Sequence, residues 1–131
     1  MSDIYRQYLL DHYHNPKNKG TMPDADISKR DVNISCGDDV EIFIKLEGKQ
    51  EGKNSSKISD IKFNGTGCVI CMASSSILSE EFTGKRLSDV KEMNTEKLLE
   101  LLKLQLTPTR IKCAMLPLVT MKKGILDYES K

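Results

Sequence analysis

Hydrophobic and polar residues alternate along the first half of the chain with the two-residue period of β-strands. Over residues 40–47 apolar side chains occupy every second position, which predicts a half-buried strand. The same alternation appears at Val32 and Ile34, and it returns over residues 58–64. Residues 21–29 are polar and irregular and are predicted to form a loop. Because short loops join successive strands, we expect an antiparallel meander.

A helical period replaces this alternation elsewhere. It marks four segments, residues 3–13, 69–83, 95–106 and a last helix from near 113 toward 128. Asn94 is a candidate N-cap for the third segment, and Gly84 offers a stop for the second. The last helix must then hold Pro117 in its first turn. The pattern predicts an α+β fold, and we expect a single domain over residues 1–131 because no internal repeat or linker is present.

The composition argues against several classes of partner. Twenty Lys and Arg residues and nineteen Asp and Glu residues leave a net charge of +1, and the charges are mixed along the 131-residue chain. There is no basic stripe with interleaved aromatic residues, so no nucleic-acid partner is expected. Apolar runs are far shorter than the roughly 20 residues that span a bilayer, so no membrane partner is expected either. Residues 1–13 carry acids and tyrosines where a signal peptide needs an apolar segment, which favours a cytoplasmic protein.

The cysteines become the main candidates for chemistry, since cytoplasmic thiols stay reduced and seldom form disulfides. They are Cys36, Cys68, Cys71 and Cys113. Cys68 precedes a predicted helix and Cys113 lies near the start of another, where the positive end of the helix dipole favours a thiolate. Arg110 and Lys112 act in the same direction on Cys113. A thiolate is both a nucleophile and a metal ligand, so both roles are open.

Cys68 and Cys71 have the spacing of half a zinc site or of a redox pair. A single Cys-x-x-Cys is a weak zinc signal, and a thioredoxin-like pair would need a βαβ unit that the predicted elements do not supply. Cys71 falls among packing residues of the helix, which favours a core or supporting role. Asp38, close to Cys36, adds a carboxylate. Three thiolates and one carboxylate make a tetrahedral site that exchanges its contents more readily than four thiolates.

Several short motifs occur in an order that is similar to one known family. They are Asn15-Pro16-Lys17-Asn18-Lys19-Gly20, Cys36-Gly37-Asp38, Gly65-Thr66-Gly67-Cys68 with Ala73-Ser74-Ser75-Ser76, and Arg110-Ile111-Lys112-Cys113-Ala114. Over nearly its whole length the chain resembles the U-type iron–sulfur cluster assembly proteins, which include IscU, SufU and the N-terminal domain of NifU. The resemblance implies an α+β fold with a small three-stranded antiparallel sheet and helices packed on one of its faces.

The resemblance also implies a site, its cofactors and its partners. Cys36, Cys68 and Cys113 would build a cluster or accept a persulfide, with Asp38 close by. We expect Asp38 to be the fourth ligand and Cys113 to be the persulfide acceptor. Members of this family receive sulfur from a cysteine desulfurase. They assemble a [2Fe–2S] cluster for apo iron–sulfur proteins or pass the sulfur to downstream assembly proteins, and isolated members often hold zinc instead of iron.

Two branches of the family differ at the residue before the third cysteine. The scaffold branch has a His there as a ligand, whereas this chain has Lys112, as in SufU. SufU members also carry an insertion before this motif, and the segment from Phe82 to Arg110 is too short to contain it. The resemblance therefore leaves open a scaffold, which is not an enzyme, and a zinc-dependent sulfurtransferase in which Arg110 and Lys112 stabilise the sulfur anion. A zinc-stabilised fold without transfer chemistry is a third alternative.

The remaining motifs have simpler interpretations. His12 and His14 are predicted to be exposed residues at the end of a helix. Ser74-Ser75-Ser76 is predicted to allow close packing of a helix through its small side chains. The stretch Leu116-Pro117-Leu118-Val119 has two interpretations. The resemblance suggests a contact for a chaperone or the desulfurase, whereas the sequence alone equally favours a buried turn of helix.

Overall fold

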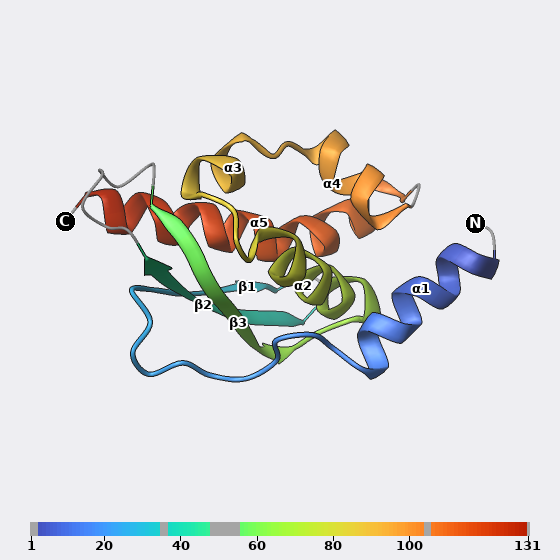
Figure 1. The fold of residues 1–131 in the computed structure, drawn as a ribbon. Helices are drawn as coiled ribbons and strands as arrows, with labels where there is room; N and C mark the ends of the chain where they lie inside the picture. The colour runs from blue at the N-terminus through green and yellow to red at the C-terminus, as the bar shows by residue number, and fades with distance from the viewer. Residues whose placement is uncertain (1–2, 35–36, 48–55, 104–105, 131) are drawn as a thin grey trace.

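A three-stranded antiparallel sheet and five helices make up the described part of the chain, which confirms the α+β prediction (Figure 1). The computed structural model describes residues 3–34, 37–47, 56–103 and 106–130. The elements in chain order are α1 (Asp3–His14), β1 (Ile27–Asn33), β2 (Asp38–Glu47), β3 (Lys57–Thr66), α2 (Val69–Phe82), α3 (Leu87–Glu92), α4 (Thr95–Leu102) and α5 (Pro108–Glu129). The strands are ordered β1-β2-β3, each antiparallel to its neighbour.

Helices α2 and α5 cover one face of the sheet, and the segment before β1 runs on the side away from them (Figure 1). The core between the sheet and these helices is apolar and includes Ile42, Ile44, Phe63, Leu78, Leu118 and Met121. Earlier in the segment before β1, the chain runs along the outer edge of β3, where the N–H of Gly20 donates to the carbonyl of Phe63 at 2.8 Å. This packing brings the start of β2, the start of α2 and the body of α5 together at one end of the sheet. None of the helices described is both long and apolar enough to cross a membrane.

Buried serines of α2 connect this helix to its neighbours. The hydroxyl of Ser76 lies 2.7 Å from Nδ1 of His12 in α1, and the hydroxyl of Ser74 donates to the carbonyl of Ala114 in α5 at 2.7 Å. Small side chains allow the three helices to approach, as predicted from the sequence. Their hydroxyls also fix the helices to one another, because a buried polar group is stable only when it is hydrogen-bonded.

The prediction of exposed histidines was wrong for His12. Its side chain is buried against α2, whereas His14 is exposed. Removal from water lowers the pKa of His12 below the usual value for histidine, and the nearby Lys17 acts in the same direction. Glu80 and Asp11 oppose this shift. His12 therefore has a structural role, in which it joins α1 to α2.

Two elements differ from the sequence prediction in the first three quarters of the chain. Strand β1 starts at Ile27, inside the predicted loop of residues 21–29, because Ile27 pairs with Ile44 of β2 and is buried in the core. Helix α3 (Leu87–Glu92) was not predicted, since it is a short element of six residues with two buried side chains. Neither difference changes the order of the strands.

The last helix starts earlier than predicted. Helix α4 ends before Lys103, which adopts a left-handed backbone with φ of 59°. Helix α5 then begins at Pro108, where the missing N–H of proline has no helical acceptor to lose. Pro117 consequently lies inside α5, and its predicted place in a first turn is wrong. The stretch Leu116 to Val119 is mostly buried, so it forms a packed turn of this helix, and a chaperone contact there stays a prediction.

Candidate metal centre

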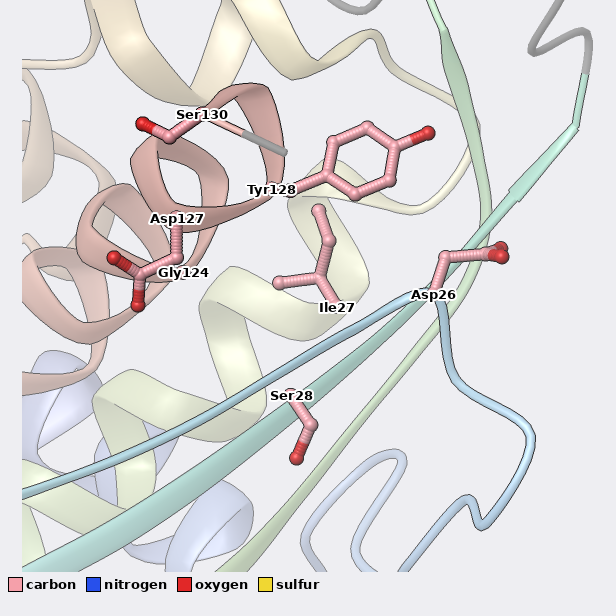
Figure 2. A pocket seen from close by; sticks show the side chains of 7 residues that line it. All are labelled: Asp26, Ile27, Ser28, Gly124, Asp127, Tyr128 and Ser130. Carbon is pink, nitrogen blue, oxygen red and sulfur yellow. The ribbon is translucent and has the colours of Figure 1, made fainter.

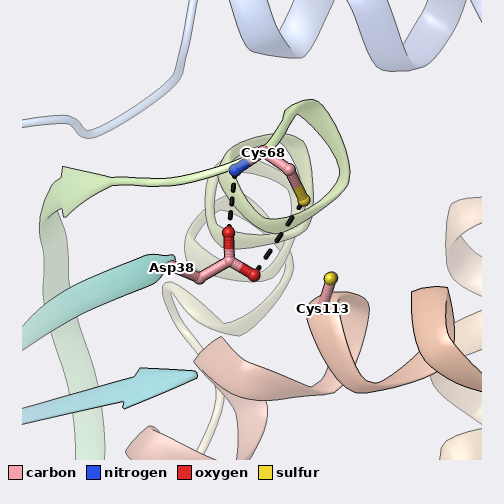
Figure 3. A group of neighbouring side chains, drawn as sticks. All are labelled: Asp38, Cys68 and Cys113. Atoms are coloured by element: carbon pink, nitrogen blue, oxygen red, sulfur yellow. Dashed lines mark hydrogen bonds between the residues drawn. The ribbon is translucent and has the colours of Figure 1, made fainter. Parts of the chain in front are cut away.

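Three of the residues singled out in the sequence converge at one end of the sheet (Figure 3). Asp38 is the first residue of β2, Cys68 is the N-cap of α2, and Cys113 belongs to α5. One ligand atom of each residue lies within 4.8 Å of those of the other two. Cys36, the fourth candidate, lies outside the described residues, two positions before Asp38 in sequence.

Asp38 is buried to an unusual degree for a carboxylate, with 1% of its surface exposed. Its Oδ1 accepts the backbone N–H of Cys68 at 2.8 Å, and its Oδ2 lies 4.0 Å from the sulfur of Cys68. A buried carboxylate needs such donors or a cation, because the charged form is otherwise strongly destabilised by loss of water. Two sulfur ligands and one carboxylate oxygen around a common point match the ligand types that zinc and iron accept.

Two glycines before Cys68 let the polypeptide come this close. Gly65 has a φ of +132°, and a Cβ there would clash with the carbonyl oxygen of Asp39 in β2. A Cβ on Gly67 would lie 2.9 Å from Oδ1 of Asp38. The glycines thus admit the backbone of β2 and the carboxylate of Asp38, and any larger residue would move one of them.

Cys68 is placed where the sequence predicted, and Cys113 is not. Cys68 caps α2 in an extended conformation, and its sulfur accepts the N–H of Cys71 at 3.4 Å. Its side chain is partly exposed. Cys113 was expected near the start of a helix, but α5 already begins at Pro108, so Cys113 lies in the second turn and is fully buried. The dipole of the helix N-terminus therefore acts on Cys68 more directly than on Cys113.

The adjacent carboxylate of Asp39 has a different partner. It accepts a hydrogen bond from Nε of Arg30 at 2.9 Å, and this guanidinium holds the pKa of Asp39 below its usual value. Asp39 is not part of the group formed by Asp38, Cys68 and Cys113. Alternation along β2 explains the contrast, since successive side chains of a strand point to opposite faces.

Arg110 and Lys112, the two basic residues predicted to act on Cys113, lie beside different hollows. Arg110 is exposed and lines a hollow of about 620 Å³ together with Cys68 and Tyr13. The hollow is otherwise mostly apolar, with Val69, Ile70 and Leu106 on its walls. Lys112 is exposed beside another hollow, next to Val32 and Ile34. Arg110 is thus brought to the hollow of Cys68, and Lys112 is not.

A further hollow of about 360 Å³ lies at the opposite end of the sheet (Figure 2). Asp26 and Asp127 line it, with their carboxylates pointing in different directions. Asp127 pairs with Lys29 at 2.7 Å, and Asp26 accepts the N–H of Leu46 at 2.8 Å. Its lining contains no thiol or imidazole, so it lacks the soft ligands of the first site.

Known proteins share this fold and sequence. The family model described as the NifU-like N-terminal domain matches residues 4–131. The zinc-dependent sulfurtransferase SufU of Bacillus subtilis (strain 168) is 30% identical over 146 residues, covering 98% of this chain and 94% of that protein. The scaffold protein IscU of Haemophilus influenzae is 30% identical over 135 residues, covering 97% of each.

A solved structure gives the same result for the fold. It is described as a scaffold protein of the SUF system from Fervidobacterium islandicum AW-1, with a TM-score of 0.73 and 26% identity over 95% of this chain and 96% of that one. This chain has 131 residues, whereas its alignment spans 146 positions with SufU and 135 with IscU. The alignment with SufU therefore contains more gaps in this chain. SufU therefore carries more residues that this chain lacks. On these matches, the chain belongs to the NifU-like N-terminal domain family.

Proposed function

We propose that this protein accepts sulfur from a cysteine desulfurase and assembles a [2Fe–2S] cluster for transfer to apo iron–sulfur proteins or to downstream assembly proteins. The observation that carries the proposal is the convergence of Asp38, Cys68 and Cys113 within 4.8 Å in a member of this family. We propose the cytoplasm as its location, since the function needs reduced thiols.

The ligands of iron in this proposal are Cys36, Asp38, Cys68 and Cys113. Thiolate ligands suit the iron of a cluster, while a carboxylate oxygen is a harder ligand that binds the same iron less tightly. A mixed set favours release of the finished cluster over permanent storage. The near-complete burial of Asp38 supports this role, because a bound cation would compensate its charge.

The sulfur acceptor in this proposal is Cys113, with Arg110 and Lys112 stabilising the anionic sulfur. Cys113 is buried and Cys68 is partly exposed, so a docked desulfurase must open the site or deliver sulfur first to Cys68. The ligand atoms of the two cysteines lie within 4.8 Å, so the outer sulfur of a persulfide on Cys68 would come close to the sulfur of Cys113, whose thiolate can attack it. Arg110 beside Cys68 is the better placed of the two cations.

Anaerobic reconstitution tests this function. Apo-protein is incubated with ferrous iron, cysteine and a cysteine desulfurase, and cluster formation is followed by visible absorption and by iron and sulfide content. We expect a [2Fe–2S] cluster in the wild type and in Asp39→Ala, whose carboxylate pairs with Arg30 instead. We expect none in Cys113→Ala. Failure of the wild type to form any cluster would refute the scaffold function.

A second function is favoured by one observation. The residue before Cys113 is Lys112, an exposed cation that cannot ligate a metal while protonated, and SufU of Bacillus subtilis is named a zinc-dependent sulfurtransferase. In this alternative Cys36, Asp38, Cys68 and Cys113 would hold zinc, which would keep the thiols ionised. Equimolar zinc in the purified protein and faster desulfurase turnover, lost in Cys113→Ala, would favour sulfur relay over cluster assembly.

A further inference from the structure

We propose that Cys71 is a resolving thiol, which attacks Cys68 when that residue carries a persulfide and thereby releases sulfide. This inference rests on the proposed function, because it requires sulfane sulfur on Cys68. It assigns chemistry to the one cysteine that the proposed ligand set does not use. The protein would then supply the electrons that convert the delivered sulfur into cluster sulfide.

The geometry at the start of α2 supports this pairing. Cys68 is the N-cap and Cys71 is the third residue of the helix, and the N–H of Cys71 already contacts the sulfur of Cys68 at 3.4 Å. Residues three apart within a helix have Cβ atoms about 5–6 Å apart, and a disulfide needs about 3.5–4.5 Å. A movement of about 1–2 Å closes a gap of that size, and it falls on the N-cap, whose backbone is extended and outside the helix.

The surroundings separate the two thiols by role. Cys68 lines the 620 Å³ hollow, so an added sulfur has space there. Cys71 is fully buried in the core, does not line the hollow, and is not part of the group of Asp38, Cys68 and Cys113. An attack by Cys71 therefore comes from the helix side, opposite the space that the leaving sulfur enters. Burial also shields Cys71 from oxidants and from desulfurase, which leaves intramolecular attack as its route of reaction.

The reaction balances without another reagent. The sulfur of Cys71 attacks Sγ of Cys68, a Cys68–Cys71 disulfide forms, and the bond between Sγ and the outer sulfur breaks. The outer sulfur leaves as hydrogen sulfide and takes the proton of the Cys71 thiol. It is reduced by two electrons, while the two cysteine sulfurs are each oxidised by one. A small-molecule thiol or a dithiol protein would return the pair to the reduced state for another cycle.

The test isolates this pair in the full-length chain. A Cys36→Ser, Cys113→Ser double variant retains Cys68 and Cys71, and inorganic polysulfide loads Cys68 anaerobically without reductant. After desalting, released sulfide and the masses of proteolytic peptides are measured. We expect sulfide equimolar with the persulfide lost, and a Cys68–Cys71 disulfide. With Cys71→Ser or Cys71→Ala added to the double variant, we expect the persulfide to persist and sulfide release to slow at least about tenfold.

Two results would overturn the inference. One is equal sulfide release with and without Cys71, in variants whose thermal unfolding shows that they are folded. The other, in wild-type protein, is a disulfide from Cys68 to Cys36 or Cys113 in place of Cys71. Loading by a desulfurase is measured separately. If the enzyme places no persulfide on any cysteine while polysulfide-loaded Cys68 still releases sulfide through Cys71, the proposed function fails and the thiol chemistry stands.

Discussion

The two ends of the sheet both carry acidic residues, and the surroundings of those residues differ. Where β2 begins, Asp38 is 1% exposed and shares a 4.8 Å cluster with Cys68 and Cys113. Near the start of β1, Asp127 of α5 is exposed, lines the second hollow and pairs with Lys29 at 2.7 Å. The first carboxylate is removed from water beside sulfur ligands, and the second is neutralised at the surface.

This difference shows that hollow space is a poor guide to the site in this molecule. Both ends are hollowed, but a metal needs ligand atoms that converge, and a buried carboxylate gains most from a cation. A surface ion pair such as Lys29–Asp127 contributes little to stability and leaves no charge for a metal to compensate. Matched variants, most of them one at each end, therefore test which features make the site.

The largest expected effect comes from the cysteine pair at the site. Cys68→Ser should lose equimolar zinc or iron from anaerobically purified protein, since it replaces a soft thiolate with a hydroxyl. Cys71→Ser should keep the metal, because Cys71 is not in the ligand group. Metal per chain, measured by elemental analysis, decides between them. Equal loss in both variants would mean that Cys71 is itself a ligand or that the helix start has collapsed.

The acidic residues give the next largest effect. Asp38→Ala should weaken metal binding at least about 10–100-fold, because it removes a carboxylate and the acceptor of the Cys68 N–H. Asp127→Ala at the opposite end should leave the affinity unchanged. A competition titration with a zinc chelator measures both. An unchanged affinity in Asp38→Ala would exclude its carboxylate from the site.

Crowded glycines at the two ends give a smaller effect. A Cβ on Gly67 would lie 2.9 Å from Asp38, and a Cβ on Gly124 in α5 would lie 2.9 Å from Ile27. Gly67→Ala should displace the carboxylate and weaken metal binding about tenfold. Gly124→Ala should lower the free energy of unfolding by about 1–3 kcal/mol at most and keep the metal affinity. Equal metal affinity in both variants would show that the position of Asp38 does not matter.

The smallest effect concerns pH and lies outside the candidate metal centre. The folded pKa of His12 is lowered, so the unfolded chain binds this proton more readily. Stability from this residue is thus present above about pH 6.5 and is lost as the pH falls below it, with a slope of at most about 1.4 kcal/mol per pH unit. His12→Asn should flatten this dependence in urea unfolding, while His14→Asn, at an exposed position, should retain it. An unaltered slope in His12→Asn would assign the dependence to other groups.

Most of the fold follows from local patterns in the sequence. The alternation over residues 40–47 predicts β2, and a glycine-flanked cysteine before a helical period predicts the capping position of Cys68, because both signals depend on near neighbours alone. The start of α5 was predicted wrongly, because a proline fits the first turn of a helix and usually disrupts its interior. The prediction therefore placed Pro117 in the first turn, whereas Pro108 is the first residue of α5 and Pro117 lies inside it. His12 was missed because its partner Ser76 is 64 residues away.

Candidate ligands could be chosen from the sequence, but their arrangement in space could not. The ligand types of Asp38, Cys68 and Cys113 can be listed from the sequence, whereas their convergence depends on the packing of α5 against the sheet. Arg110 and Lys112 face different hollows because residues two apart point to different sides of a helix. The sequence prediction started this helix near Cys113, so it did not place the two residues on helical turns. Cys36 lies outside the described residues, so its place in the site stays a prediction.

The composition of the metal's coordination shell tests the central claim most directly. X-ray absorption of the zinc-loaded protein at the zinc edge distinguishes sulfur ligands at about 2.3 Å from oxygen ligands at about 2.0–2.2 Å. We predict a mixed shell in which sulfur dominates, and loss of the protein oxygen ligand in Asp38→Ala with the sulfur ligands retained. A shell without sulfur, or one that Asp38→Ala leaves unchanged, would contradict a centre built from Asp38, Cys68 and Cys113.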